Sequence, residues 1–475
     1  MPSNARILPL VIASALFMEQ MDSTIIATSL PAMAADLGVS PTSLKLAFTT
    51  YLLGLTVVLP VSGWAADRFG AKTVFRLAIV IFTLASAACG LASSLHWLVV
   101  ARGVQGIGGA LMVPVGRIIV LRSVKKSELL DALAWLTIPA LIGPVIGPPV
   151  GGYITMTYDW RWIFWMNLPF GVAAFALASW LMPNIKADTP PSLDVKGFLL
   201  SGAGLTLTVL GLTVAGRGLF TGPEVVIMIA AGVAFLVAYA AHARRSRVPI
   251  LDLRLMRIPS YRHSMLGGNL FRIAVGAVPF IMPLMLQLGF GFSPFASGMV
   301  TFASAFGALS MKFTVARIVR TFGYRSLLIV NGLLCCATFA AMGFFRATTP
   351  FWMMFAVLLV GGFMRSLQFS SLNTLAYADV DRNDIAKANT LYTVVQQLFL
   401  AMGVAVAAFL LDFRLWWSGR SMLTPADFSF VLFVTAAISA FAVISYMKLE
   451  TDAGASISGH AEEEGESPSG QVTRA

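Results

Sequence analysis

A few charged residues stand inside long apolar stretches of this sequence, where their chemistry would matter. Burying an ionised side chain away from water is costly, so such residues usually pair with one another or serve a pathway for protons, ions or substrates. A buried carboxylate can bind and release a proton when a neighbouring cation moves, because burial disfavours its charge and the cation favours it. The candidates are Glu19, Asp22, Arg102, Arg117, Arg272, Lys312 and Arg365.

Asp22 and Arg102 stand at matching depths. Asp22 lies about eight residues before the first apolar stretch ends near Leu30, and Arg102 lies about six residues after the fourth begins near His96. At about 1.5 Å per residue, both would lie roughly 9 to 12 Å below the same membrane surface and could pair. The pair could load and release a proton, or it could be a permanent ion pair that braces two helices.

Glu19 precedes Asp22 by three residues and therefore lies on nearly the same face of a helix. Each of these carboxylates would oppose the ionisation of the other. Glu19 could share the proton or attract a cationic substrate, or it could be a water-exposed carboxylate without a role.

The other cations differ in depth. Arg117 and Lys312 lie near predicted helix ends, where long basic side chains reach the headgroups, whereas Arg272 and Arg365 lie deeper. With nearby amides, these residues could line a polar path, although hydrogen bonds between helices would explain the same amides. The predicted cavity residues are Arg117, Asn269, Arg272, Arg365, Gln368, Asn373 and Gln396, with Gln397 beside them.

Membrane-spanning helices must position these residues. The chain has 475 residues, of which 57% are hydrophobic and 12% charged, whereas soluble domains carry about 25% charged residues. One helical span needs about 20 apolar residues. The apolar stretches predict fourteen spans, at 7–32, 44–64, 74–92, 96–121, 132–156, 161–181, 195–215, 223–243, 263–289, 295–317, 325–345, 351–373, 389–411 and 427–447.

The expected fold class is an all-α polytopic membrane protein built from two bundles. Two longer and more polar connections, 183–196 and 244–262, bracket the seventh and eighth spans. Transporters are often built from repeated bundles around a central site. The expected parts are an N-terminal six-helix bundle at 1–182, a linker with two inserted helices at 183–262, a C-terminal six-helix bundle at 263–449 and a disordered cytoplasmic tail at 450–475.

Basic residues are divided unequally between the two sets of loops. The loops after even-numbered spans, together with the termini, hold most of them, including the cluster from Arg244 to Arg262, while the opposite loops hold few, such as Lys45 and Arg161. Cytoplasmic loops carry the excess of positive charge, so both termini are predicted to be cytoplasmic. The net charge of +11 therefore reflects topology and not nucleic-acid binding.

Other classes of function fit poorly. The four histidines lie at helix ends, in loops or in the tail, so we expect no enzyme, no metal site and no cofactor. Cys89, Cys335 and Cys336 fall inside apolar stretches, where packing is the simplest role. The sequence has no Walker A motif, which disfavours ATP-driven pumping.

Short motifs lie in one loop between the predicted helices and within two of the helices themselves. The loop 63–72 reads GWAADRFGAK, the fourth span contains RGVQG at 102–106, and the fifth contains a glycine and proline pattern. These motifs resemble signatures of the major facilitator superfamily over nearly the whole chain. The resemblance implies a cytoplasmic latch at Gly63, Asp67, Arg68, Gly70 and Lys72 and an antiporter motif at Gly143, Gly147, Pro148, Gly151 and Gly152.

The first span adds a more specific likeness. MDSTII at 21–26, followed by Leu30 and Pro31, resembles a motif of the fourteen-helix drug:proton antiporter family within that superfamily. The resemblance implies that Asp22 is the proton site, with Arg102 and Glu19 beside it. In the second half, Arg320 stands where the first loop has Asp67, so a symmetric second latch is not expected.

The resemblance implies the major facilitator fold and a proton-coupled antiporter that exports small molecules, drugs or other lipophilic compounds, across the bacterial inner membrane by alternating access. The expected partners are protons, a small-molecule substrate and the lipid bilayer, with no nucleic acid, and we expect a monomer. One alternative remains open, because Arg272 and Arg365 against Glu19 would favour export of an organic anion or a metal chelate of one.

Overall fold

The computed structural model describes residues 4–124, 128–187, 192–215, 222–381, 384–420, 422–450 and 453–454, and its regular structure there is entirely helical. Within these ranges, fourteen segments are long and apolar enough to cross a membrane, which confirms the predicted number. Of the tail predicted at 450–475, residues 451–452 and 455–475 lie outside the described residues, as do the loop cations Lys125, Lys126, Arg217 and Arg382.

The first bundle contains six spans, several of which combine more than one helical segment. They are α1 (Asn4–Ile25) with η1 (Ile26–Ser29) and α2 (Leu30–Asp36); η2 (Pro41–Leu44) with α3 (Lys45–Val58), η3 (Leu59–Val61) and α4 (Ser62–Phe69); α5 (Ala71–Gly90); α6 (Leu95–Ser123); α7 (Leu129–Thr157); and α8 (Trp162–Trp165) with α9 (Asn167–Leu181).

The inserted helices and the second bundle follow. They are α10 (Val195–Val214), α11 (Gly222–Arg245), η5 (Leu253–Arg257), α12 (Pro259–Leu284) with the π-helical η6 (Met285–Gly289), α13 (Pro294–Met311), α14 (Val315–Phe322), α15 (Tyr324–Gly343), α16 (Phe351–Ala376), α17 (Ile385–Ser418) and α18 (Pro425–Met447).

Two predicted boundaries are wrong. The span predicted at 295–317 ends at Met311, and α14 is a separate helix, because its two arginines and its apolar residues give it one polar and one apolar side. The span predicted at 389–411 continues to Ser418, because Asp412 inside it is neutralised by a lysine of the first bundle.

Each half has a glycine at the turn between a short helix and the span that follows it. Gly70 separates α4 from α5 with φ +94°, and Gly323 separates α14 from α15 with φ +65°. Residues with a side chain rarely adopt this backbone conformation, so glycine is favoured at both places. At Gly70 space is restricted as well, since a Cβ would lie 2.9 Å from Cγ of Asn184.

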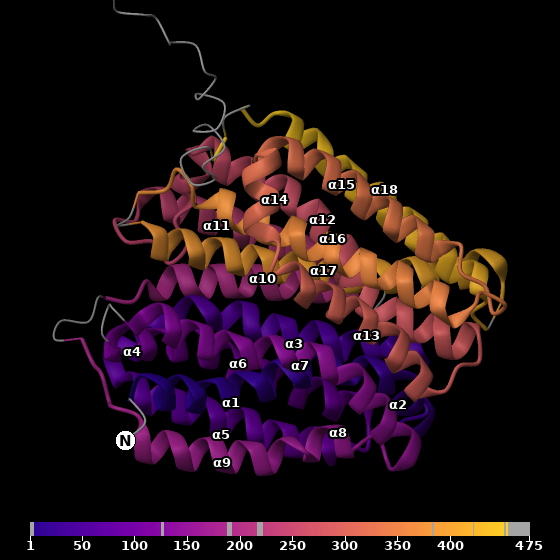
Figure 1. Cartoon of the computed structure of the whole chain (residues 1–475), viewed down its shortest axis with the longest axis horizontal. Coiled ribbons are helices and arrows are strands. Elements are labelled where there is room, and N and C mark those ends of the chain that lie inside the picture. Colours follow the sequence, from indigo (N-terminus) through magenta and orange to yellow (C-terminus); the bar gives the residue numbers. More distant parts are fainter. Residues whose placement is uncertain are drawn as a thin grey trace, which may run out of the picture.

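The bundles lie side by side, with α10 along their boundary (Figure 1). α3 packs against α17, and α7 packs against α13. α10 packs against both α3 and α17, where Leu53, Val209 and Ala401 form a common apolar cluster. The first inserted helix therefore contacts both bundles.

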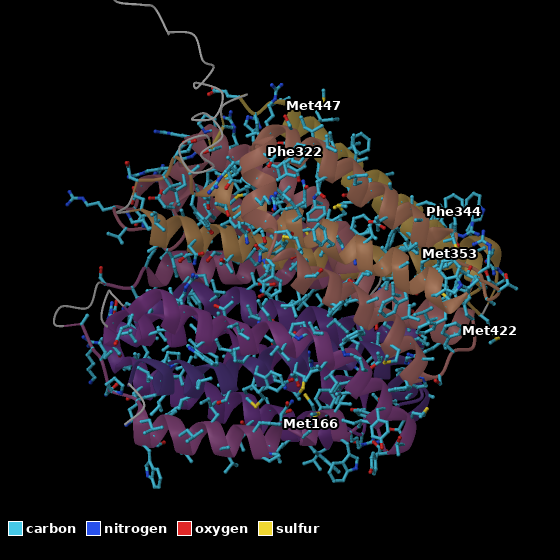
Figure 2. All side chains as sticks on the ribbon, in the orientation of Figure 1. Met166, Phe322, Phe344, Met353, Met422 and Met447 are labelled. Atoms are coloured by element: carbon cyan, nitrogen blue, oxygen red, sulfur yellow. The ribbon has the colours of Figure 1, made fainter. Side chains whose placement is uncertain are left out.

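The outer surface of the helices is apolar. Figure 2 shows Phe344, Met353 and Met447 at the edge of the second bundle, and all three side chains are exposed. Soluble proteins rarely expose large contiguous apolar surfaces, so this perimeter fits contact with lipid.

Asp194 joins the start of α10 to α11 and to the connection that follows it. Its carboxylate accepts hydrogen bonds from Gly197 N at 2.9 Å, from His242 Nε2 at 2.7 Å and from Ile250 N at 3.2 Å. Burial alone would raise the pKa of Asp194, but these hydrogen bonds outweigh burial and lower that pKa below its ordinary value.

Asp194→Asn should lower the thermal unfolding temperature at pH 7, with a free-energy loss of about 1 kcal/mol, because the neutral amide caps the helix about as well as the carboxylate but forms weaker hydrogen bonds with His242 and Ile250 N. A carboxyl group whose pKa is lowered by folding stabilises the protein above its ordinary pKa of 3.8, and this contribution disappears as pH falls through the lowered value. The gap between wild type and variant should therefore shrink below pH 3.8. Asp384→Asn, which alters an exposed pair with Lys387, is the control. Equal melting curves for Asp194→Asn and wild type at pH 7 would show that the hydrogen bonds of the Asp194 carboxylate do not stabilise the fold.

Candidate functional site

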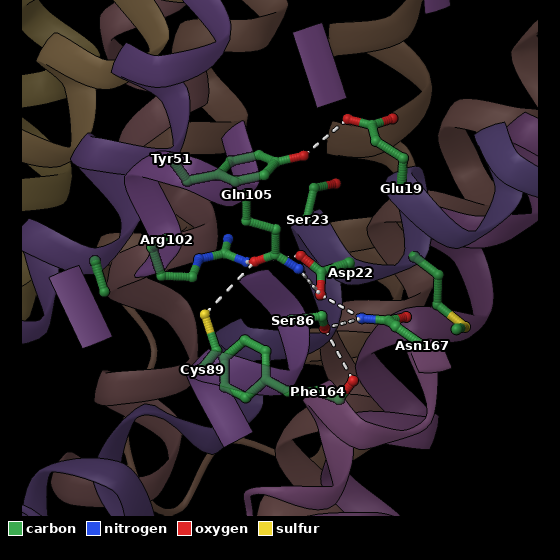
Figure 3. A network of polar contacts seen from close by, with 12 residues as sticks. Glu19, Asp22, Ser23, Tyr51, Ser86, Cys89, Arg102, Gln105, Phe164 and Asn167 are labelled. Carbon is green, nitrogen blue, oxygen red and sulfur yellow. Dashed lines mark hydrogen bonds and ion pairs between the residues drawn. The ribbon is translucent and has the colours of Figure 1, made fainter. Parts of the chain in front are cut away.

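Asp22 lies at the centre of a buried polar network in the first bundle (Figure 3). Its Oδ2 accepts a hydrogen bond from Arg102 Nη1 at 2.6 Å. Its Oδ1 accepts from Gln105 Nε2 at 3.0 Å and from Asn167 Nδ2 at 2.6 Å. The structure thus brings together Asp22 and Arg102, whose matching depths were predicted, and joins α1, α6 and α9 through a single carboxylate.

Arg102 depends on this carboxylate for its countercharge. Its side chain is 1% exposed, and its Nη1 also donates to Gln105 Oε1 at 2.6 Å. The ring of Tyr51 lies 4.2 Å from the guanidinium carbon, a distance at which a cation is attracted to an aromatic face. Protonation of Asp22 would remove the negative charge and leave the guanidinium buried without a countercharge.

Asn167 was not among the predicted site residues. Its Nδ2 also approaches Ser86 Oγ at 3.0 Å, and Ser86 Oγ donates to Phe164 O at 2.9 Å. The sequence does carry a signal, since Asn167 is an amide at the start of an apolar segment, and the structure buries it fully at the first position of α9. Buried amides in membrane helices usually have polar partners.

Glu19 lies outside this network. Its Oε1 accepts from Tyr51 OH at 2.8 Å, and its Oε2 accepts from Gln20 Nε2 at 2.7 Å. It lines a cavity of about 460 Å³ between the bundles, here called the Glu19 cavity, whose walls include Gly63, Gly109, Arg117, Asn389 and Gln397. Glu19 lines this space but is only 3% exposed, so it is not the water-exposed carboxylate that the sequence left open. Asp22 is 0% exposed, and Tyr51 contacts both Glu19 and Arg102.

The predicted antiporter motif forms two close contacts of α7. On one face, a Cβ at Gly143 would lie 3.0 Å from Met21 N, and one at Gly147 would lie 3.3 Å from Met21 O. On the other face, a Cβ at Gly152 would lie 2.8 Å from Phe295 Cα in α13. Gly151 packs against Ile25, on the same face of α7 as Gly143 and Gly147. One helix thus holds the helix of Asp22 on one side and the second bundle on the other.

The residues of the predicted latch contact other residues of the first half of the chain. Asp67 Oδ1 pairs with Arg122 Nη1 of α6 at 2.8 Å, and Asp67 O accepts from Ala187 N at 3.3 Å. Arg68 is exposed and Lys72 is partly buried. Gly63 lines the Glu19 cavity, so the latch loop begins at its edge.

The predicted polar path of the second bundle separates into distinct groups. Arg272 is fully buried and donates to Asn269 Oδ1 at 3.3 Å and to Gln396 Oε1 at 3.5 Å, with the ring of Tyr392 4.7 Å away. Gln368 instead bonds Asn331 and Leu328 O of α15, as expected for a contact between helices. Asn373 lies partly buried further along α16.

Arg365 faces a second cavity, of about 390 Å³, here called the Arg365 cavity. It lies between α1 and α7 of the first bundle and α12, α13 and α16 of the second. Thr24, Pro148, Met282, Ser304, Lys312 and Arg365 are among its lining residues. A residue of the antiporter motif, Pro148, is therefore part of its wall.

One ion pair between the bundles was missed. Lys45 was expected in a loop, but it is 1% exposed, and its Nζ lies 3.1 Å from Oδ2 of Asp412. Thr42 Oγ1 donates to Asp412 Oδ1 at 2.9 Å. Both charges fall at the very edges of predicted spans, which was the available signal. The pair lies at the opposite end of the bundles from the latch loop.

Comparisons with known proteins agree with this architecture. Residues 12–251 and 264–470 match the family model of the Major Facilitator Superfamily. A candidate multidrug resistance protein, MdtD, of Cronobacter sakazakii is 38% identical over 420 residues, which cover 86% of this chain and 87% of the relative. The MdtD of an Escherichia coli strain is 36% identical over 417 residues, with 86% and 87% coverage. The crystal structure of a D-xylose-proton symporter aligns with a TM-score of 0.66 over 94% of this chain and 98% of that one, at 15% identity, a likeness of fold alone.

A double-mutant cycle tests the buried pair. Arg102→Met leaves the Asp22 carboxylate buried without a countercharge, which should lower the free energy of unfolding by about 3 to 5 kcal/mol. Adding Asp22→Asn should recover part of that loss, because the unpaired charge disappears. The exposed Asp384 and Lys387 pair is the matched control, with an expected coupling of no more than about 1 kcal/mol. Additive losses at Asp22 and Arg102, measured by denaturation in detergent, would argue against a coupled ion pair.

Proposed function

We propose, from the premise that this chain belongs to the Major Facilitator Superfamily, that it is a proton-coupled antiporter that exports small molecules across the bacterial inner membrane. The observation that carries the proposal is the buried Asp22, whose charge is balanced by Arg102 and by donors from two further residues. The relatives named for multidrug resistance support drugs or other lipophilic compounds as substrates.

The proton acts through the charge of Arg102. When Asp22 binds a proton, the buried guanidinium loses its countercharge, and the arrangement of α1 against α6 and α9 becomes less favourable. α7 passes a shift of α1 to α13, because its glycines hold α1 on one face and its outer end contacts α13 on the other. Proton and substrate then favour different states of the same two-bundle equilibrium, as coupling requires.

Glu19 has the better position for exchange with water. It faces the Glu19 cavity and bonds Tyr51, whose ring covers Arg102. We therefore assign Glu19 a place between the cavity and Asp22 on the proton route. Its carboxylate also gives this cavity an attraction for cationic compounds, which Arg117 in the same wall reduces.

The contacts between the bundles support alternating access. At the end where Lys45 pairs with Asp412, Gln287 Nε2 also donates to Thr28 O at 2.9 Å, and the rings of Phe48 and Phe280 lie 6.3 Å apart. The Glu19 cavity lies toward the latch loop. With both termini in the cytoplasm, this state is closed to the outside, and outward opening requires the buried ion pair to separate. We propose that the protein works as a monomer.

A second substrate class has one specific observation in its favour. Arg272 and Arg365 have no carboxylate partner within the described part of the chain, whereas Arg102 has one. Buried charges are normally paired, so export of an organic anion or a metal chelate of one remains the alternative.

Transport in inverted membrane vesicles with an acidic interior tests the proton coupling. A substrate found in a panel of cationic dyes and organic acids should dissipate the gradient through wild type. Asp22→Asn should reduce this at least about tenfold, because the neutral amide binds no proton, and Glu19→Gln should slow it. Asp384→Asn, which changes an exposed carboxylate, is the matched control. Equal transport by wild type and Asp22→Asn, or transport indifferent to the gradient, would refute antiport through Asp22.

The outer closure is tested by cysteine labelling on intact cells. In a background without Cys89, Cys335 and Cys336, a cysteine replacing the fully buried Thr28 should react slowly with a membrane-impermeant methanethiosulfonate. Asp412→Asn should speed this reaction several-fold, because Lys45 loses its countercharge and the bundles separate more often. Asp384→Asn should leave the rate unchanged. If Asp412→Asn also leaves it unchanged, the ion pair does not hold the outer side closed.

A further inference from the structure

The Arg365 cavity differs in chemistry from the Glu19 cavity. Among the described residues that line it, Arg365 and Lys312 are charged and neither Asp nor Glu is present. Most of the other lining side chains are apolar, among them Val278, Met282, Leu358 and Phe369, while Thr24, Thr301, Ser304 and Ser366 contribute hydroxyls. A ligand here would meet apolar walls and two cations.

The guanidinium of Arg365 has unused hydrogen-bonding capacity. Its side chain is 8% exposed, and its Nη2 donates to Ser304 Oγ at 2.6 Å. Its Nη2 carries a second N–H on the side of Ser304, which lines the cavity, whereas its Nη1 has no hydrogen-bond partner among the described residues but is buried beside Gly361, outside the cavity wall. An arginine carries five N–H donors in a plane that fits a carboxylate or sulfonate. The second lining cation, Lys312, donates to Ser370 Oγ at 2.7 Å.

A nearby cation strengthens the positive field. Arg272 lies 5.5 Å from the ring of Phe369, which lines the Arg365 cavity, and it bonds amide oxygens and not carboxylates. The buried carboxylates described in the first bundle have other partners, Asp22 with Arg102 and Glu19 with Tyr51. An anion that entered the cavity would supply the countercharge that Arg365 lacks.

We propose that the Arg365 cavity binds amphipathic organic monoanions, with the acidic group on Arg365 and the apolar body between α7, α12 and α16. A volume of about 390 Å³ and apolar walls suit one hydrophobic body with one acidic group. A small polyanion or a hydrated metal chelate would need many more polar donors than these walls offer. This inference rests on the proposed export function and names its substrate class.

The occupant of this cavity would contact the coupling helices directly. Thr24 of α1, two residues after Asp22, lines the cavity, and so do Pro144 and Pro148 of α7. The same α7 carries the glycines that pack on α1. An anion held by Arg365 in the second bundle therefore touches the helix that carries the proton site in the first.

Fluorescence binding with dansylglycine, a monoanion, and dansylamide, its neutral counterpart, tests the proposal on purified protein in nanodiscs. Wild type should bind dansylglycine saturably and at least about tenfold more tightly than dansylamide, the usual strength of a hydrogen bond to a charged group. Arg365→Gln should remove this preference and leave dansylamide unaffected. Arg346→Gln, at an exposed loop arginine, should change neither. Equal affinity for the two probes, or a wild-type preference retained in Arg365→Gln, would overturn the proposal.

Two further variants keep the test valid if Arg365→Gln does not fold. Arg365→Lys should retain a weaker preference for dansylglycine, and Ala305→Phe, which fills the cavity, should abolish saturable binding. Unchanged dansylglycine binding in Ala305→Phe would place the anion elsewhere and refute the site. The measurement uses no proton gradient, so loss of the anion preference leaves antiport through Asp22 untouched, while gradient-independent transport would refute antiport without affecting this binding result.

Discussion

The buried contact between Asp22 and Arg102 orders the centre of the first bundle. Two charges taken out of water are tolerated only when their geometry is good and their remaining donors and acceptors are satisfied. Gln105 and Asn167 supply hydrogen bonds to the carboxylate from α6 and α9, and the ring of Tyr51 covers the guanidinium from α3, while Arg102 Nε has no hydrogen-bond partner among the described residues. Four helices are thereby fixed around one carboxylate. Because a single proton changes the charge of that carboxylate, the same contact that orders the bundle also makes its packing sensitive to protonation.

α7 is the helix through which a displacement of α1 would reach the second bundle. Its small residues allow backbone contact with α1 on one face and, at Gly152, with α13 on the other. Contacts this close leave no flexible side chains to absorb a displacement. Prolines at several positions of α7 remove backbone hydrogen bonds, which lets the helix bend at fixed places. The glycine and proline pattern therefore has a mechanical meaning that does not depend on the direction in which substrates move.

The sequence contained the depth of each charge but not the identity of its neighbours. Composition and length were enough for the fourteen spans, and residue rise along a helix was enough to place Asp22 level with Arg102. The ion pair between Lys45 and Asp412 could not be predicted, because each residue lies at the end of a predicted span. No local sequence pattern connects two positions so far apart in the chain. Likewise Gln368 was a reasonable cavity residue by depth, yet its rotation on α16 turns it toward α15. Helix rotation and pairing are tertiary properties, which spacing along one helix does not determine.

The groups proposed to bind the two ligands differ in charge and lie in different halves. The buried carboxylates near the coupling site, Asp22 and Glu19, belong to the first bundle, while Arg272 and Arg365 belong to the second. In the proposed mechanism, a proton changes the charge of the first half, and an anion changes the charge of the second. Both ligands then act on the interface that α1 and α7 share with α12, α13 and α16. Coupling in such an arrangement requires no contact between proton and substrate, because each alters the stability of the same contact between bundles.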